Sequence, residues 1–328
     1  MDAQTTFPYF AGLKVLYVHG FASSGASHTA ALLQQKLPKA TVLHPDLPLE
    51  PADMMPFLRN YCAAHRPDLI VGTSMGGMLT EKLRGFDRIC VNPALHIDQS
   101  IGTTLRYGDM PMLAPRADGI ATVSVTKALA KAFAPVCADN FAGLDEADAH
   151  RCVGLFGTED TTVDCRAEFA AHYPYAIPFV GGHRLNDHTL LHAVMPVMRR
   201  FDRWSSGREL PAVFLHIDTL RRDGGALVSD ARAAVEMLCR HFETYVVAPP
   251  EASCDAWVLD QFGVDLWHRV VTTAHMGTLL GDYLVTPCER HAGQFAGTTL
   301  LFGSPTFKTW TLTQDYFSHL LPSPAEMA

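Results

Sequence analysis

The stretch IVGTSMGGML, residues 70–79, constrains the fold of this chain more than any other segment. Apolar and small residues lead directly into Ser74, and glycines occupy positions 72, 76 and 77. A buried strand that turns at once into a helix needs small residues on both sides of the turn, because the two backbones crowd each other there. The pattern Gly72-x-Ser74-x-Gly76 therefore predicts a serine held at the tip of a sharp strand-to-helix turn. The alternative is an ordinary glycine-rich loop.

Strand-like and helix-like segments alternate on both sides of this turn. Buried-strand patterns are found at 13–20, 40–48, 68–73, 87–95, 150–160 and 172–183, and helical spacing at 26–38, 51–67, 77–86 and 188–204. Such alternation predicts an α/β fold with a parallel sheet and helices on both faces.

Two segments interrupt the alternation of strands and helices, and they predict the domain organisation. Residues 96–150 are rich in polar and small residues, and we expect an insertion, or lid, above the strand ends. The polar segment SSGRELP, 205–211, reads as a linker, after which a new strand–helix series begins. We therefore predict an α/β domain over 1–205 and a second, smaller α/β domain over 211–322.

The composition excludes several classes of function. The chain has 328 residues, 48% of them hydrophobic, and a net charge of −8, which argues against nucleic acid as a partner. Neither a signal peptide nor an apolar run long enough for a membrane span is apparent. The eight cysteines are scattered without a C-x-x-C pair, so we expect reduced buried thiols in a cytoplasmic protein, with no metal and no cofactor. A homodimer is compatible with the sequence.

A serine hydroxyl needs a base to accept its proton and a carboxylate to orient that base. The segment LFGTEDTTVD offers Glu159, Asp160 and Asp164 just past a strand, and Asp160 is favoured by its G-x-x-D-x-x-V setting. His183 follows a strand and two glycines, and the order Ser74, Asp160, His183 is the order found in hydrolases. These three residues are the predicted catalytic group.

An oxyanion site is expected in YVHGFASSG, after the first strand. His19 and Gly20 stand at the strand end, and the N–H of Phe21 would meet the substrate oxygen. The N–H of Met75, directly after the serine, would be the second donor. A plain turn is the alternative for this segment.

Taken together, LYVHGFASSG, HPDLP, IVGTSMGG, VNPA, LFGTEDTTVD and GGHRLND resemble the YqiA-like branch of small α/β-hydrolase esterases, over residues 13 to about 200. The resemblance implies a serine esterase acting on short, simple esters as small-molecule partners. It also implies that HPDLP shapes the pocket floor or the oxyanion loop, and that Asn92 closes a loop beside the serine without acting in catalysis. A thioesterase or amidase with the same residues, and a scaffold that only binds, remain alternatives.

The second half resembles the haloacid-dehalogenase-like fold, in its 5'-nucleotidase branch, most strongly at LLGDYLV, 279–285. An active member needs two aspartates after the first strand, where this chain has His216 and Asp218. Further positions of that pattern hold Ala248, Met276 and Thr286-Pro287. The resemblance thus implies a degenerate domain that serves packing, dimerisation or covering of the active site, with a metal-dependent phosphatase as the alternative.

Overall fold

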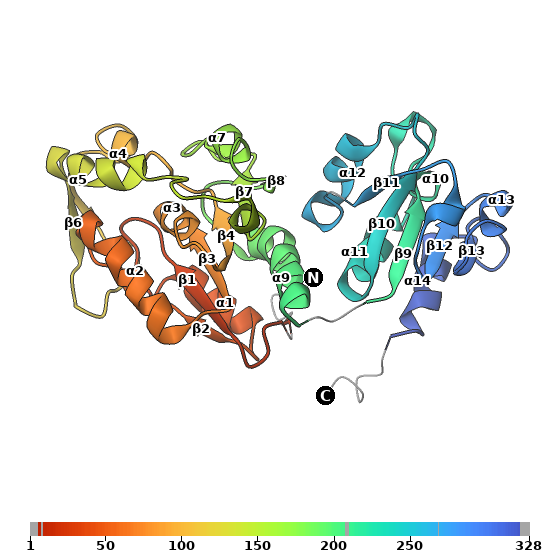
Figure 1. The fold of residues 1–328 in the computed structure, drawn as a ribbon, viewed down its shortest axis with the longest axis horizontal. Helices are drawn as coiled ribbons and strands as arrows, with labels where there is room; N and C mark the ends of the chain where they lie inside the picture. Colours follow the sequence, from red (N-terminus) through yellow and green to blue (C-terminus); the bar gives the residue numbers. More distant parts are fainter. Residues whose placement is uncertain (1–5, 8, 207–209, 268, 322–328) are drawn as a thin grey trace. The chain divides into compact units, whose positions relative to one another are not determined.

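The structure, a computed structural model, describes residues 6–7, 9–206, 210–267 and 269–321. The chain forms two compact units, residues 1–206 and 207–328, which are described separately (Figure 1). Residues 207–209 of the predicted linker lie outside the described part. Residues 205–206 are not linker but the end of a helix, because the helical segment continues through them.

The first unit is built on a six-stranded sheet in which all strands are parallel, in the order β2-β1-β3-β4-β7-β8. The strands are β1 (Lys14–Val18), β2 (Thr41–Leu43), β3 (Leu69–Thr73), β4 (Asp87–Val91), β7 (Cys152–Gly157) and β8 (Ala176–Phe179). Because every strand runs in the same direction, all six carboxyl ends meet at one edge of the sheet.

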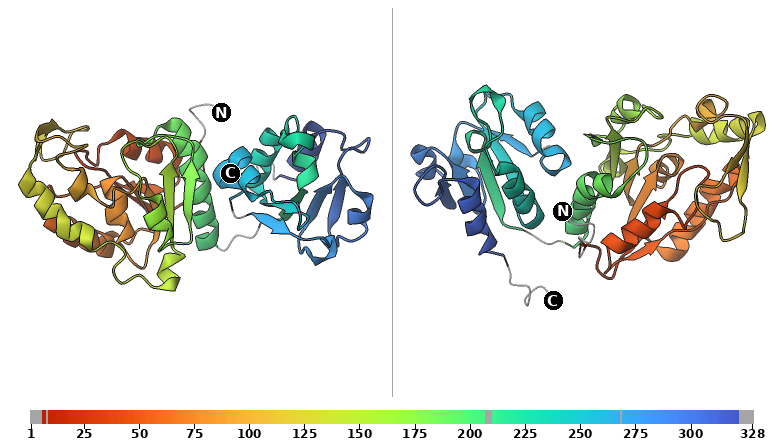
Figure 2. Two further views of the ribbon diagram at one scale, coloured as in Figure 1. Left: turned by 90° about the horizontal axis from the view of Figure 1, so that it is seen from above. Right: turned by 180° about the vertical axis from the view of Figure 1, so that it is seen from behind.

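Helices follow the strands and cover both sides of the sheet (Figure 2). They are α1 (His28–Lys36), α2 (Pro51–His65), α3 (Met75–Glu81), α7 (Arg166–Ala170), α8 (Asp187–Thr189) and α9 (Met195–Ser206), with a π-helical turn at Leu190–Val194. The parallel α/β fold is thus confirmed, and its strands are buried on both faces, as their continuous apolar runs indicate.

The segment between β4 and β7 has its own small structure. It contains α4 (Ile97–Ser100), the antiparallel pair β5 (Gly108–Pro111) and β6 (Thr122–Val125), α5 (Lys127–Ala138) and α6 (Glu146–Ala149). Phe133 and Val125 anchor it, since both are buried in the same core cluster as Met78 and Leu79 of α3.

The second unit has a five-stranded parallel sheet in the order β11-β10-β9-β12-β13. Its elements are β9 (Ala212–His216), α10 (Ile217–Leu220), α11 (Ala231–His241), β10 (Glu243–Ala248), α12 (Asp255–Phe262), β11 (Val270–Thr272), β12 (Tyr283–Thr286), α13 (Glu289–Ala292), β13 (Thr298–Leu301) and α14 (Trp310–Ser318), with single 3-10 turns at Asp223–Gly225, Gly263–Asp265 and Met276–Thr278. The chain order reverses between β9 and β12, which is where doubly wound folds bind ligands.

Within the described residues, none of the helices combines the length and the apolar character that a bilayer crossing requires.

Candidate active site

Ser74 occupies the turn between β3 and α3, in a conformation that few side-chain-bearing residues adopt, with φ 57° and ψ −122°. The glycines around it are required because neighbouring atoms leave no room for a side chain. A Cβ on Gly72 would collide with the carbonyl of Gly76 and with Thr80, and a Cβ on Gly76 would collide with the carbonyl of Val18. The structure therefore has the predicted sharp turn, with β3 ending at Thr73 and α3 beginning at Met75.

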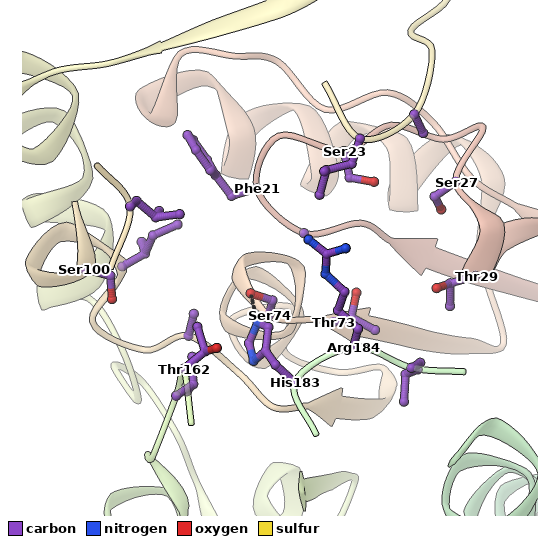
Figure 3. A pocket seen from close by; sticks show the side chains of 18 of the residues that line it. Phe21, Ser23, Ser27, Thr29, Thr73, Ser74, Ser100, Thr162, His183 and Arg184 are labelled. Atoms are coloured by element: carbon purple, nitrogen blue, oxygen red, sulfur yellow. Dashed lines mark hydrogen bonds between the residues drawn. The ribbon is translucent and has the colours of Figure 1, made fainter. Parts of the chain in front are cut away.

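His183 lies between Ser74 and Asp160 and bonds to both. Its Nε2 is 3.0 Å from the Ser74 hydroxyl (Figure 3). Its Nδ1 is 2.7 Å from Oδ2 of Asp160. The Asp160 side chain is 1% exposed and that of His183 is 21% exposed. A carboxylate on Nδ1 fixes the tautomer whose Nε2 can accept a proton from the serine.

The two competing acids of the same loop do not take this position. Asp164 and Glu159 are exposed, and neither has a recorded bond to His183. Oδ1 of Asp160 accepts the N–H groups of Thr162 and Val163, at 2.7 and 3.0 Å, which holds its Oδ2 towards the imidazole. The structure thus brings together Ser74, His183 and Asp160.

Asn92 ties three strand ends together behind this group. Its amide donates to the carbonyls of Gly182 and His183, at 3.0 and 3.2 Å, and its side-chain oxygen accepts the N–H of Gly157 at 2.7 Å. It is 2% exposed. Asn92 therefore fixes the loop that carries the histidine to the loop that carries the acid. Its side chain makes no hydrogen bond to Ser74 within the described residues.

His19 controls the loop expected to hold the oxyanion. Its Nε2 accepts the N–H of Leu47 at 3.1 Å, so Nδ1 carries the proton and donates to the Gly20 carbonyl at 2.9 Å. In the planar peptide that follows, the N–H of Phe21 points away from that carbonyl. Burial lowers the pKa of His19 and keeps the ring neutral, as this pairing requires.

The HPDLP segment supports the same loop. Asp46 accepts the N–H of Gly25 through one carboxylate oxygen and that of Ala117 through the other, both at 2.7 Å. Leu47, in the same segment, bonds His19. The predicted role of this segment beside the oxyanion loop agrees with these contacts.

A cavity of about 500 Å³ opens onto Ser74 and His183. One part of its wall is apolar and comes from Phe21 together with the 96–150 segment. The apolar residues from that segment are Ile97, Leu105, Met110, Leu113 and Ala114. The other part is hydroxyl-rich, with Ser23, Ser27, Thr29 and Thr73 (Figure 3).

Two lining residues were missed by the sequence reasoning. Tyr17 points its hydroxyl to Thr73 at 2.9 Å, and burial raises the pKa of that phenol. Arg184, next to His183, lies on the hydroxyl-rich side of the cavity. The only signal for Arg184 was its place beside the predicted base, whereas Tyr17 reads as an ordinary strand residue.

One group among the described residues has metal-ligand character: His96, Cys165 and Glu168. His96 Nε2 and Glu168 Oε2 are 2.6 Å apart, so they satisfy each other directly. Burial raises the pKa of the Cys165 thiol, which disfavours the thiolate that a metal would need. His96 precedes α4, Cys165 and Glu168 stand at the start of α7, and none of the three lines the cavity.

Comparisons with known proteins place the first unit in a family. A search of curated proteins finds no match. Among solved structures, an α/β hydrolase from a metagenome of Mar Chica lagoon sediments in Morocco is 11% identical, with a TM-score of 0.39, covering 60% of this chain and 91% of its own. Est1E from Butyrivibrio proteoclasticus is 14% identical, with a TM-score of 0.37, covering 62% and 88%. The model of an uncharacterised protein family, UPF0227, matches residues 14–193, the region of the YqiA-like resemblance. The chain belongs to the UPF0227 family.

Proposed function

We propose that the protein is a serine hydrolase that cleaves short-chain carboxylic esters through an acyl-enzyme. The observation that carries this proposal is the continuous series of hydrogen bonds from Ser74 through His183 to Asp160, at a sharp turn that opens into a cavity. A buried carboxylate, an oriented imidazole and a serine in a strained turn are together the parts that acyl transfer needs.

The reaction follows from these parts. Oγ of Ser74 attacks the ester carbonyl while Nε2 of His183 takes the hydroxyl proton, and Asp160 stabilises the imidazolium that results. The N–H groups of Phe21 and Met75 receive the negative oxygen. The tetrahedral intermediate expels the alcohol, which takes the proton from His183. Water, deprotonated by His183, then releases the acid and restores Ser74.

Thioesters and amides are the second candidates, because the same residues could attack either carbonyl. Nothing in the cavity favours nitrogen as the leaving atom over oxygen or sulfur. Rates on matched acetyl esters, thioesters and anilides would rank the three classes.

The first test is hydrolysis of p-nitrophenyl acetate, butyrate and octanoate by the wild type and by Ser74→Ala. We expect the variant to lose about 10⁴-fold or more in kcat/KM, because no other group supplies the nucleophile. A fluorophosphonate should label the wild type and not the variant. Wild-type activity in Ser74→Ala would refute the proposal, and binding without labelling would favour a scaffold.

For the second unit we propose a degenerate haloacid-dehalogenase-like domain without phosphatase chemistry. The proposal is supported by the donor set at the ends of β9 and β12. His216 accepts the N–H of Asp218 at 3.4 Å, and Thr286 lies 2.9 Å from Nδ1 of His291. Asp218 lies beside His216, whose ring centroid is 4.9 Å from that of His291, and such imidazoles do not suit Mg²⁺, which prefers oxygen ligands in near-octahedral geometry.

A further inference from the structure

The cavity beside Ser74 contains one permanently charged side chain, Arg184. Among the described lining residues there is no aspartate or glutamate. The structure records no hydrogen bond or ion pair for the Arg184 guanidinium within the described part of the chain. An arginine directly after the predicted base places a permanent positive charge at the cavity wall, beside the Asp160 carboxylate that His183 bonds.

The position of Arg184 relative to Ser74 divides the cavity into two sides. Figure 3 shows Arg184 on the same side of Ser74 as Ser23, Ser27 and Thr29, with its guanidinium directed into the space between Ser74 and the loop that follows β1. Phe21 lies away from this group, on the apolar side. A substrate carbonyl held at Ser74 would thus have one end against a mainly apolar wall that also carries Ser100 and Thr162, and the other end against a guanidinium and hydroxyls.

This second side suits a negatively charged group. A guanidinium binds a carboxylate or phosphate through paired N–H donors, and such charge-assisted bonds are stronger than neutral ones. Ser23 offers a hydroxyl donor on this side, and the hydroxyls of Ser27 and Thr29, which also bond the Tyr17 phenol, line the same wall. Asp187 is an acidic residue that contacts His28, a residue of the cavity wall. It faces His28 across 3.7 Å, with the His28 side chain exposed and that of Asp187 half-exposed.

We propose that Arg184 and the hydroxyls beside it form an anion subsite, so that the preferred substrates are esters that carry a carboxylate or phosphate near the scissile bond. This inference rests on the proposed ester hydrolysis and names its substrate class. Arg184 is itself exposed, so solvent screening limits the gain, and we expect a preference that weakens as the salt concentration rises.

The test compares esters matched in size. Mono-p-nitrophenyl glutarate against p-nitrophenyl valerate reports an anion on the acyl half. 4-Acetoxybenzoate against its methyl ester reports a carboxylate on the alcohol half, and 4-acetoxyphenyl phosphate against its dimethyl ester reports a phosphate there. The uncatalysed rate of each ester is subtracted, and the measured quantity is the ratio of kcat/KM for the anionic and neutral members of each pair.

We expect this ratio to exceed one for the wild type in at least one pair, and to fall about tenfold in Arg184→Gln. Arg184→Lys should keep part of it, because the charge remains and the paired donors are lost. Arg59→Gln is the matched control, since Arg59 is exposed on α2 and does not line the cavity. An equal fall in Arg59→Gln would assign the effect to net charge and overturn the subsite, as would an unchanged ratio in Arg184→Gln.

Binding separates this inference from the proposed function. Calorimetry of monomethyl glutarate with Ser74→Ala, with and without Arg184→Gln, measures the subsite without turnover. Weaker binding in the double variant supports the subsite even if no ester is cleaved. Identical binding in both would overturn it while leaving ester hydrolysis untouched.

Discussion

Ser74 and Asp160 depend on backbone geometry that reaches only a few residues along the chain. The positive φ of Ser74 is maintained because Gly72 and Gly76 allow the neighbouring backbones to approach. Asp160 uses one oxygen to close its own loop and the other to hold His183. Single changes at these positions should therefore act on the site with little effect on the core.

We expect Asp160→Asn to lower kcat by about 10³- to 10⁴-fold, because an amide at that position stabilises the wrong imidazole tautomer and leaves the imidazolium without its counter-charge. The measurement is p-nitrophenyl butyrate hydrolysis together with a thermal melt to show that the variant is folded. Asp164→Asn is the matched control and should keep most of the activity, since Asp164 is exposed. A larger loss in Asp164→Asn than in Asp160→Asn would reverse the assignment.

His19 makes the stability of the first unit depend on pH. Its pKa in the folded protein lies below the ordinary value of 6.5 because of burial. As the pH falls below about 6.5, the unfolded chain binds a proton at this residue that the folded chain does not, so the free energy of unfolding decreases. Denaturant titrations at pH about 7.5 and about 5.5 should show a smaller loss for His19→Gln than for the wild type. An equal loss in both would exclude His19 as a source of the pH dependence.

At the scale of elements, the site is assembled by the ends of β3, β4, β7 and β8 meeting at one sheet edge, with Asn92 bonded across three of those ends. We expect Asn92→Ala to lower the free energy of unfolding by about 1–3 kcal/mol, since it leaves buried groups without partners and places alanine at a positive φ. Asn92→Gly also removes the side-chain bonds but avoids the strain, because glycine tolerates a positive φ. Reduced kcat in both variants would show that the bonds position the loops, whereas wild-type kcat in both would leave Asn92 a purely structural role.

The elements themselves were largely readable from the sequence. Strand and helix patterns depend on residues two to four positions apart, and the turn at Ser74 depends on glycines in its own neighbourhood. The choice of Asp160 over Asp164 depended on the loop signature, which is equally local. Arg184 and the apolar wall were not predictable, because they become lining residues only when 96–150 and the loop after β8 meet above the sheet.

At the scale of the whole molecule, the chain combines two sheets, each built of parallel strands, and the residues at the carboxyl ends of the strands differ between them. Those of the first unit hold a hydrogen-bonded serine, histidine and acid, whereas those of the second hold His216, Ala248 and Thr286. We expect added Mg²⁺ to leave p-nitrophenyl phosphate and nucleoside monophosphates uncleaved by the full chain. Metal-dependent phosphate release that survives in Ser74→Ala would contradict the proposed degeneracy.

The way the 96–150 segment joins the sheet has a consequence for the history of the protein. The chain leaves β4 and re-enters at β7, its immediate neighbour in the sheet, so the register of the six strands does not depend on what lies between. Mutation could change the cavity-lining residues 97–114 and alter which molecules enter, while Val125, Phe133 and Asp148 keep the rest of the segment packed and Ser74, Asp160 and His183 stay where the strands put them. Selectivity and reactivity can thus evolve as separate traits.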